Sequence, residues 1–337
     1  MLQKFLILFK LGYPSFWKKN NNLFEKILIF FLLPFSFIYL LIFKINQKIR
    51  KTNKVGVPVI CVGNINVGGS GKTPFVIYLI KLFKEKKINA HIVSRGYLGK
   101  INGPTKVNVK KHTVKDVGDE ALLLAKKTDT WISKNKFEGA LMATLNGAEV
   151  IILDDGLQNK TLHQDLKIII TDGTFGFGNG FLIPSGPLRE NIQSRINKSD
   201  LMIIFNKDKY LIEKKIKNKI SIIHANSEIK NFNYINNKKI IAFSGIGRPE
   251  KFYYSLIKKK LNIIKFFPFP DHYLYKKKEI NKLINYAKKE KSVLVSTFKD
   301  KQRINIAQRK KIFFIDQKVK LKKKEKLINI LKKKKIV

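Results

Sequence analysis

The 337-residue sequence has little cysteine and little negative charge. Its single cysteine, Cys61, excludes an intramolecular disulfide and a cysteine-based zinc site, and it fits a reducing compartment. Cys61 lies within an apolar run, so we expect a small core side chain rather than a nucleophile. The sequence also contains no internal repeat, RNP-type aromatic motif, zinc finger or helix-turn-helix signature, which leaves no motif for nucleic-acid binding.

The basic charge is large, because 68 Lys and Arg stand against 24 Asp and Glu, for a net charge of +44. Such a charge fits nucleic acid or an anionic membrane surface. It also fits a compositional bias, since lysine, isoleucine and asparagine are plentiful along the whole chain. The charge alone does not choose between these readings. Without a nucleic-acid motif, we expect an anionic membrane surface and no nucleic acid as partner.

Residues 27–43 form an uninterrupted apolar stretch without a charge. As a helix it would be ~25 Å long, short of a hydrocarbon core of ~30 Å. Pro34 at its middle favours a kinked or broken helical hairpin in the membrane interface. Basic residues on both sides, with Phe16, Trp17 and Tyr39, suit such an anchor. A true span and a buried core helix are the alternatives, and no signal-peptide cleavage site follows.

Strand and helix patterns alternate after residue 50, as in a parallel α/β sheet. Apolar, β-branched runs predict strands at 57–62, 90–93, 149–153, 166–171, 201–205, 240–243, 292–296 and 311–315. Helices are expected at 74–84, 121–127 and 279–290. The polar, asparagine-rich segment 220–238 predicts an inter-domain connection, and a chain of this length typically forms two domains.

The most informative segment is glycine-rich and follows the first predicted strand. It contains Gly68, Gly69, Ser70, Gly71, Lys72 and Thr73. In a phosphate-binding loop, backbone N–H groups converge on an anion, the lysine reaches the outer phosphates and the threonine hydroxyl meets Mg²⁺. The strict pattern requires a glycine where this chain has Asn66. Nucleotide binding is our interpretation, and a plain strand-to-helix turn is the alternative.

Other segments carry residues suited to chemistry, each with a structural alternative. Asp154 and Asp155 follow an apolar strand, where an acid could hold Mg²⁺ or cap the strand end. Asp119 opens a helix, so it could act in catalysis or only stabilise the helix N-terminus. His272 and Arg189 lie in turn-rich segments and could serve a site or only the fold.

One pattern misleads. The segment 205–209 resembles the guanine-reading motif of GTPases, but Lys209 stands where that motif needs aspartate, which excludes a GTPase.

Taken together, these segments resemble the tetraacyldisaccharide 4'-kinase family, the lipid A 4'-kinases of Gram-negative bacteria. The resemblance covers nearly the whole chain after residue 50, and the family also lacks the glycine replaced here by Asn66. It rests on motifs in a fixed order: the loop 62–74, Ser94-Arg95-Gly96-Tyr97, Gly118-Asp119-Glu120, the run 153–158 with Asp154, Asp155 and Gln158, Asp165, Asp172, the loop 177–190, the segment 245–252 and Asp271-His272.

The resemblance implies a fold and a reaction. The fold is α/β, with a P-loop NTPase-like parallel-sheet domain at 51–225, a smaller C-terminal α/β domain at 226–337 and an N-terminal membrane-anchor region with a membrane-associated helix at 1–50. The reaction is transfer of the ATP γ-phosphate to the 4'-hydroxyl of tetraacyldisaccharide 1-phosphate in lipid A biosynthesis, giving lipid IVA. We expect a monomer at the cytoplasmic face of the inner membrane.

The resemblance also implies residue roles. Lys72 would stabilise the β- and γ-phosphates, and Asp119 would be the general base, paired with His272 from the second domain. Mg²⁺ would be held by Thr73 and Asp154. The ATP-binding set would comprise Asn66, Gly68, Gly69, Ser70, Gly71, Lys72, Thr73, Asp155, Gln158, Arg189 and Glu190.

Three positions depart from the family pattern. Leu98 replaces a glycine, Lys136 an arginine and Phe298 a glutamate, which leaves substrate-side details open. The alternative from another class is a membrane-associated P-loop ATPase or binding module that couples nucleotide state to a partner. That alternative needs neither a lipid substrate nor a histidine from the second domain.

Overall fold

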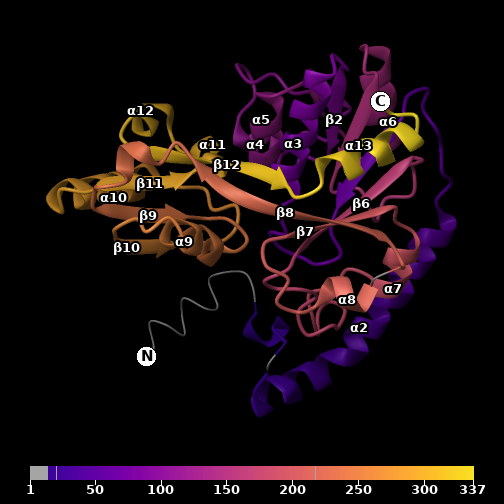
Figure 1. The fold of residues 1–337 in the computed structure, drawn as a ribbon, viewed down its shortest axis with the longest axis horizontal. Helices are drawn as coiled ribbons and strands as arrows, with labels where there is room; N and C mark the ends of the chain where they lie inside the picture. The colour runs from indigo at the N-terminus through magenta and orange to yellow at the C-terminus, as the bar shows by residue number, and fades with distance from the viewer. Residues whose placement is uncertain (1–13, 20, 217) are drawn as a thin grey trace. The chain divides into compact units, whose positions relative to one another are not determined.

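The computed structural model describes residues 14–19, 21–216 and 218–337, which cluster into two compact units. The larger unit comprises Ser15–Ser227 and Val319–Val337, and the smaller one contains Glu228–Lys318. The predicted α/β fold class is confirmed, including the apolar N-terminal helix (Figure 1). The domain limits expected above stay a prediction, and residues 1–13 of the anchor region lie outside the described residues.

The larger unit is built on one sheet, in which the predicted parallel pattern is present. Its strands are β1 (Val59–Gly63), β2 (Ala90–Ser94), β3 (Thr105–Lys106), β4 (Thr130–Ile132), β5 (Val150–Asp154), β6 (Leu166–Asp172), β7 (Leu201–Phe205) and β8 (Ser221–Lys230). They lie in the order β8-β7-β6-β1-β5-β2-β4-β3, and the short edge strand β3 pairs antiparallel with β4. The central strand β1 pairs parallel with β5 and β6, so their carboxyl ends share one edge.

The central strands of this sheet are buried along their whole length, because helices cover both faces, as is usual for parallel sheets. The helices of this unit are η1 (Ser15–Trp17), α2 (Leu23–Ile49), α3 (Lys72–Glu85), α4 (Val114–Val117), α5 (Asp119–Ala125), α6 (Lys136–Leu145), α7 (Ile192–Asn197), α8 (Ile212–Ile216) and α13 (Lys324–Lys333).

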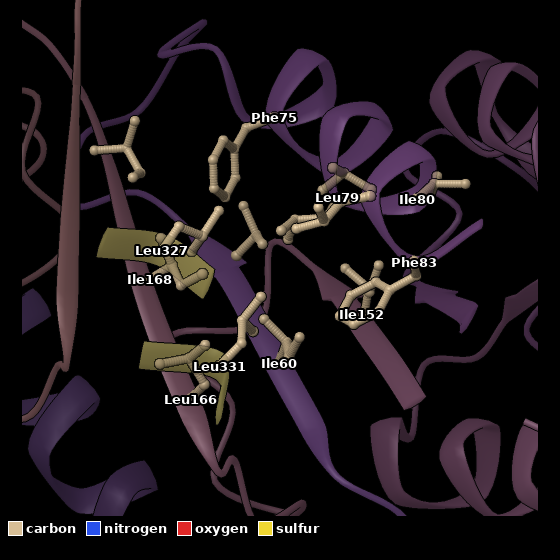
Figure 2. Packing of buried hydrophobic residues seen from close by; sticks show 14 of the residues in the cluster. Ile60, Phe75, Leu79, Ile80, Phe83, Ile152, Leu166, Ile168, Leu327 and Leu331 are labelled. Carbon is tan, nitrogen blue, oxygen red and sulfur yellow. The ribbon is translucent and has the colours of Figure 1, made fainter. Parts of the chain in front are cut away.

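The core of one sheet face joins segments that lie far apart in the sequence. Phe75, Leu79 and Phe83 of α3 pack over apolar side chains of β1, β5 and β6, and Leu327 and Leu331 of α13 belong to the same cluster (Figure 2). Cys61 is fully buried in the cluster of the opposite face, which confirms it as a core residue. Both faces of β1 are therefore packed, and the phosphate-loop segment begins from a rigid strand.

Helix α2 is one continuous helix of 27 residues, so the expectation of a broken helical hairpin at Pro34 is wrong. A capping box begins it, since the Asn22 side chain accepts from Glu25 N (2.8 Å) and the Glu25 carboxylate accepts from Asn22 N (3.2 Å). Proline removes one backbone donor, but contacts beyond it hold the next turn in place. There Ser36 Oγ donates to Leu182 O at 2.9 Å.

The length and exposure of α2 suit a membrane. At 1.5 Å per residue it is ~40 Å long, and among the described residues it is the one helix long and apolar enough to cross a bilayer. Most of its large apolar side chains are exposed, with Phe30 at 69%.

The smaller unit is a four-stranded parallel sheet with helices. Its strands are β9 (Ile240–Ser244), β10 (Ile263–Pro268), β11 (Val293–Thr297) and β12 (Phe313–Leu321), in the order β10-β9-β11-β12. Its helices are η2 (Asn233–Ile235), α9 (Pro249–Ile257), α10 (Lys277–Lys289), α11 (Phe298–Gln302) and α12 (Ile306–Arg309). The chain does pass to the smaller unit within the expected connection at 220–238, between Ser227 and Glu228, but the first part of this segment is the strand β8, because Ile223, Ala225 and Ile229 alternate as buried side chains between its polar residues.

Candidate active site

The glycine-rich loop joins β1 to α3, and two glycines give it its shape. Gly68 and Gly71 have φ angles of 96° and 105°, in the region that favours glycine. Backbone hydrogen bonds tie the loop to the 187–189 segment, from Val67 N to Pro187 O and from Arg189 N to Ile65 O, both 2.8 Å. The Asn66 side chain donates to Gly176 O at 2.9 Å, so it supports the loop from outside.

Lys72, the first residue of α3, lies at the centre of the polar site. Its Nζ donates to Asn64 Oδ1 at 3.1 Å and lies 3.6 Å from Asp155 Oδ2. Arg189 Nη1 contacts both Asp155 oxygens, at 2.9 and 3.0 Å. Burial disfavours the charge of Asp155, but Lys72 and Arg189 outweigh that effect and hold its pKa below the usual value.

A second chain of contacts leads to the same lysine through Asn64. Gln158 Nε2 donates to Asn64 O at 3.1 Å and to Glu190 Oε1 at 2.8 Å. Arg195 Nη2 donates to Glu190 Oε2 at 2.7 Å, and both of these side chains are buried. The structure therefore brings Lys72, Asp155, Gln158, Arg189 and Glu190 together. Asn64 and Arg195 were not predicted, although Asn64 directly follows the strand that leads to the loop.

Asp154, at the end of β5, is buried beside a second buried ion. Burial, with a smaller contribution from the Glu120 charge, raises the pKa of Asp154 to about 7. Lys136 is 4% exposed, and burial lowers its pKa to about 8 although Asp154 and Asp155 oppose that shift. Asp154 Oδ1, Lys136 Nζ and Ser70 Oγ are buried without a hydrogen-bond partner within the described ranges. Unpartnered buried polar atoms of this kind fit a site completed by a polar ligand and a cation.

Asp119 is the first residue of α5 and directly follows Gly118, whose φ of 82° lies in the region that favours glycine. A Cβ atom at Gly118 would lie 2.4 Å from Tyr97 O, so this turn packs closely on the loop after β2. Asp119 is 2% exposed, and its Oδ1 accepts from Glu120 N at 2.9 Å. Thr73 Oγ1 lies 3.3 Å from Glu120 Oε1, which joins this motif to the phosphate loop. After Asn64 and Arg195, Glu120 is the third site residue to which the sequence assigned no role.

His272 belongs to the smaller unit, so its predicted pairing with Asp119 stays a prediction. Its backbone has a φ of 56°, and its N–H donates to Gly245 O at 3.1 Å. Lys299 Nζ lies 3.4 Å from its Nε2, and Asp271 Oδ1 lies 3.7 Å from the same atom. Phe298, which departs from the family pattern, packs beside Phe314 with ring centroids 6.4 Å apart. Lys299 therefore places a positive charge beside this histidine.

Comparison with known proteins places this geometry in a family. The chain matches the family model "LpxK: Tetraacyldisaccharide-1-P 4'-kinase" over residues 28–335. The tetraacyldisaccharide 4'-kinase of Gluconobacter oxydans is 37% identical over 85% of this chain and 87% of that protein. The one from Paramagnetospirillum magneticum is 38% identical over 86% of this chain and 89% of that protein.

A solved structure agrees with the sequence relatives. The crystal structure of the "apo" form of LpxK from Aquifex aeolicus in complex with ATP is 30% identical, with a TM-score of 0.74. The match covers 91% of this chain and 99% of that chain. The resemblance drawn from the motifs is thereby confirmed, and the chain belongs to the LpxK family of tetraacyldisaccharide 4'-kinases, enzymes of lipid A biosynthesis.

Proposed function

We propose that the larger unit binds ATP and Mg²⁺ and that its residues direct the γ-phosphate to the 4'-hydroxyl of tetraacyldisaccharide 1-phosphate. The observation that carries this proposal is the meeting of Lys72, Asp155 and Arg189 at the N-terminus of α3. The related LpxK from Aquifex aeolicus, solved in complex with ATP, supports the choice of nucleotide.

The polar atoms around the loop suit this ligand. The 14-residue helix α3 directs its N-terminal N–H groups and partial positive charge toward the loop, where phosphates would bind with Gly68, Gly69, Ser70 and Gly71. Lys72 and Arg189 add two positive charges near the phosphates. Thr73 and Asp154 would hold Mg²⁺, which supplies further positive charge to the phosphate oxygens when bound. Gln158 and Glu190 would fix the loop from the other side.

We assign the general base to Asp119. Its carboxylate is buried and lies next to Glu120, which contacts Thr73 of the phosphate loop. A sugar hydroxyl needs a nearby proton acceptor to attack phosphorus, and a carboxylate can accept that proton. His272 would pair with Asp119 and raise its basicity when the substrate is bound.

The test is ³²P transfer from ATP to tetraacyldisaccharide 1-phosphate in detergent micelles. We expect Asp119→Asn to lower kcat about 10²- to 10⁴-fold with ATP affinity retained, and His272→Ala to lower kcat in the same direction. Asp316→Asn, an exposed acid on β12, is the matched control. An unchanged kcat in Asp119→Asn would refute the assignment of Asp119 as the general base. Transfer near the wild-type rate in Lys72→Ala would refute the role of the loop.

We further propose that α2 holds the enzyme as a monomer on the cytoplasmic face of the inner membrane. The exposed apolar side chains of the helix support this location, as do the basic residues on both sides of it: Lys18, Lys19, Lys26, Lys44, Lys48, Arg50 and Lys51. Light scattering in detergent tests the oligomeric state.

A further inference from the structure

Helix α2 makes two hydrogen bonds to main-chain carbonyls of the candidate active site. Tyr39 Oη donates to Arg189 O at 2.7 Å. About two turns further along the helix, Gln47 Nε2 donates to Gln158 O, also at 2.7 Å. A helix that serves only as a membrane anchor needs neither contact.

Each of these carbonyls belongs to a residue whose side chain leads to Lys72. The Arg189 guanidinium pairs with Asp155, and Asp155 lies 3.6 Å from Lys72 Nζ. The Gln158 side chain donates to Asn64 O, and the Asn64 side chain accepts from Lys72 Nζ. The hydrogen bonds from Tyr39 and Gln47 are therefore the first contacts in the two series that lead, through Asp155 and through Asn64, to Lys72.

Neighbouring contacts hold the helix against the same loop. Ser36 Oγ donates to Leu182 O and contacts Ser185 Oγ at 2.7 Å. Trp17 of η1, which precedes α2, adds a hydrogen bond from its Nε1 to Pro184 O at 2.9 Å. Burial raises the pKa of Tyr39, so its hydroxyl keeps the proton that it donates. The 182–189 loop is thus fixed on one side by the phosphate loop and on the other by α2.

We propose that Tyr39 and Gln47 are positioning residues for the nucleotide site. They hold the main chain of Arg189 and Gln158, so that the side chains of both residues are in place before ATP binds. Ordering these groups in advance lowers the entropy lost on binding and so raises affinity. The inference rests on the nucleotide site proposed above, because it needs Arg189 to contribute to ATP binding.

The test compares Tyr39→Phe with wild type in the full-length enzyme in detergent micelles. Phenylalanine keeps the ring, which stacks on Phe43, and removes only the donor. We expect KM for ATP and Kd of a fluorescent ATP analogue to rise about 3- to 10-fold, the usual effect of one hydrogen bond. We expect kcat at saturating ATP and KM for the lipid to stay within about twofold of wild type. Tyr254→Phe is the matched control, because Tyr254 is 64% exposed in the smaller unit.

Two further variants keep the outcome decisive. Gln47→Leu should raise KM for ATP in the same way, and it stands in if Tyr39→Phe melts at a lower temperature. In the double variant Tyr39→Phe/Arg189→Ala, KM for ATP should be no higher than in Arg189→Ala alone, because Tyr39 acts through Arg189.

Normal ATP affinity in both Tyr39→Phe and Gln47→Leu would overturn the inference, and so would a change confined to KM for the lipid. If Arg189→Ala also binds ATP normally, the proposed nucleotide site itself is wrong. If Arg189→Ala weakens binding and the two α2 variants do not, only the positioning role fails.

Discussion

At the scale of single residues, the site holds two ionisable side chains out of water. Asp154 and Lys136 are both buried, and each is shifted toward its neutral form: the pKa of Asp154 is raised to about 7 and that of Lys136 lowered to about 8. Such shifts are common where a ligand supplies the missing charge or hydrogen bond. Lys136 is one of the departures from the family pattern, and lysine cannot form the bidentate contacts of arginine.

The raised pKa of Asp154 gives a testable pH dependence of stability. The folded protein holds the Asp154 proton more tightly than the unfolded chain, whose value is 3.8, so stability from this group is present below about pH 4 and lost as pH rises to about 7. In EDTA, Asp154→Asn should therefore melt at a higher temperature than wild type at pH 8, with a smaller difference at pH 4. Each 1 kcal/mol corresponds to about 2–4 °C in Tm.

Magnesium supplies the control for that prediction. Adding Mg²⁺ to the ATP-bound protein should raise the Tm of wild type at pH 8 by more than that of Asp154→Asn. A Tm difference in EDTA that does not vary with pH would show that the buried carboxyl is not the group being titrated.

At the scale of elements, the turn before α5 fixes where Asp119 lies. Gly118→Ala places a Cβ at a φ of 82° and 2.4 Å from Tyr97 O, so the turn must shift. We expect a loss of about 1–3 kcal/mol of stability and a lower kcat, since Asp119 moves with the turn. Thermal melting and phosphate transfer measure the two effects. Gly56→Ala, where no heavy atom lies within 4 Å of the added carbon, should be silent, and equal losses in both variants would contradict this account.

A second element-scale prediction concerns α13. Leu327 is fully buried in the cluster beneath α3, so Leu327→Ala should cost about 2–5 kcal/mol in urea unfolding. Leu145→Ala is the control, because that leucine is 72% exposed at the end of α6. If the two variants unfold at the same urea concentration, α13 is not part of the cooperative core.

Elements also show where sequence reasoning succeeds and fails. Strands β1, β5 and β6 were found, because their β-branched residues and their glycine or aspartate ends are local signals, and β7 was found from its unbroken apolar run. The three-residue strand β4 and the helix α6 gave no comparable signal, and β8 alternates polar residues that read as a connection. Pro34 led to the wrong expectation of a broken helix, because the low helix preference of proline is outweighed here by tertiary contacts such as that of Ser36 with Leu182.

The site was partly predictable for the same reason. Lys72, Thr73, Asp154 and Asp155 stand at ends of strands and starts of helices, where the parallel sheet brings them together. Arg189 and Glu190 needed the family resemblance, since no spacing rule places a loop more than a hundred residues beyond the phosphate loop. Asn64, Glu120 and Arg195 act through contacts that only coordinates reveal.

At the scale of the whole molecule, we expect α2 to determine the location of the enzyme. Phe30, Phe31 and Phe37 are exposed on the protein, and their replacement by asparagine should reduce flotation with anionic lipid vesicles about tenfold or more. The reason is that inserting three aromatic side chains into the bilayer contributes several kcal/mol. Flotation with zwitterionic vesicles should be weaker than with anionic ones for the wild type, because the flanking residues are basic.

An equivalent set of exposed apolar positions away from α2 provides the control. Leu145→Asn, Tyr254→Asn and Ile306→Asn change side chains of comparable exposure and should leave flotation as in wild type. Full flotation of the α2 triple variant would mean that another part of the chain binds the membrane.

The return of the chain to the larger unit at Val319 also sets an order of events during synthesis. The ribosome makes α2 and the strands β1 to β7 first, then Glu228–Lys318, and only afterwards α13. Leu327 and Leu331 complete the core beneath α3, so the helix that carries Lys72 lacks part of its packing until translation is well advanced. The apolar surface of α2 emerges much earlier. The nascent chain can therefore reach the membrane before its nucleotide-binding core has closed.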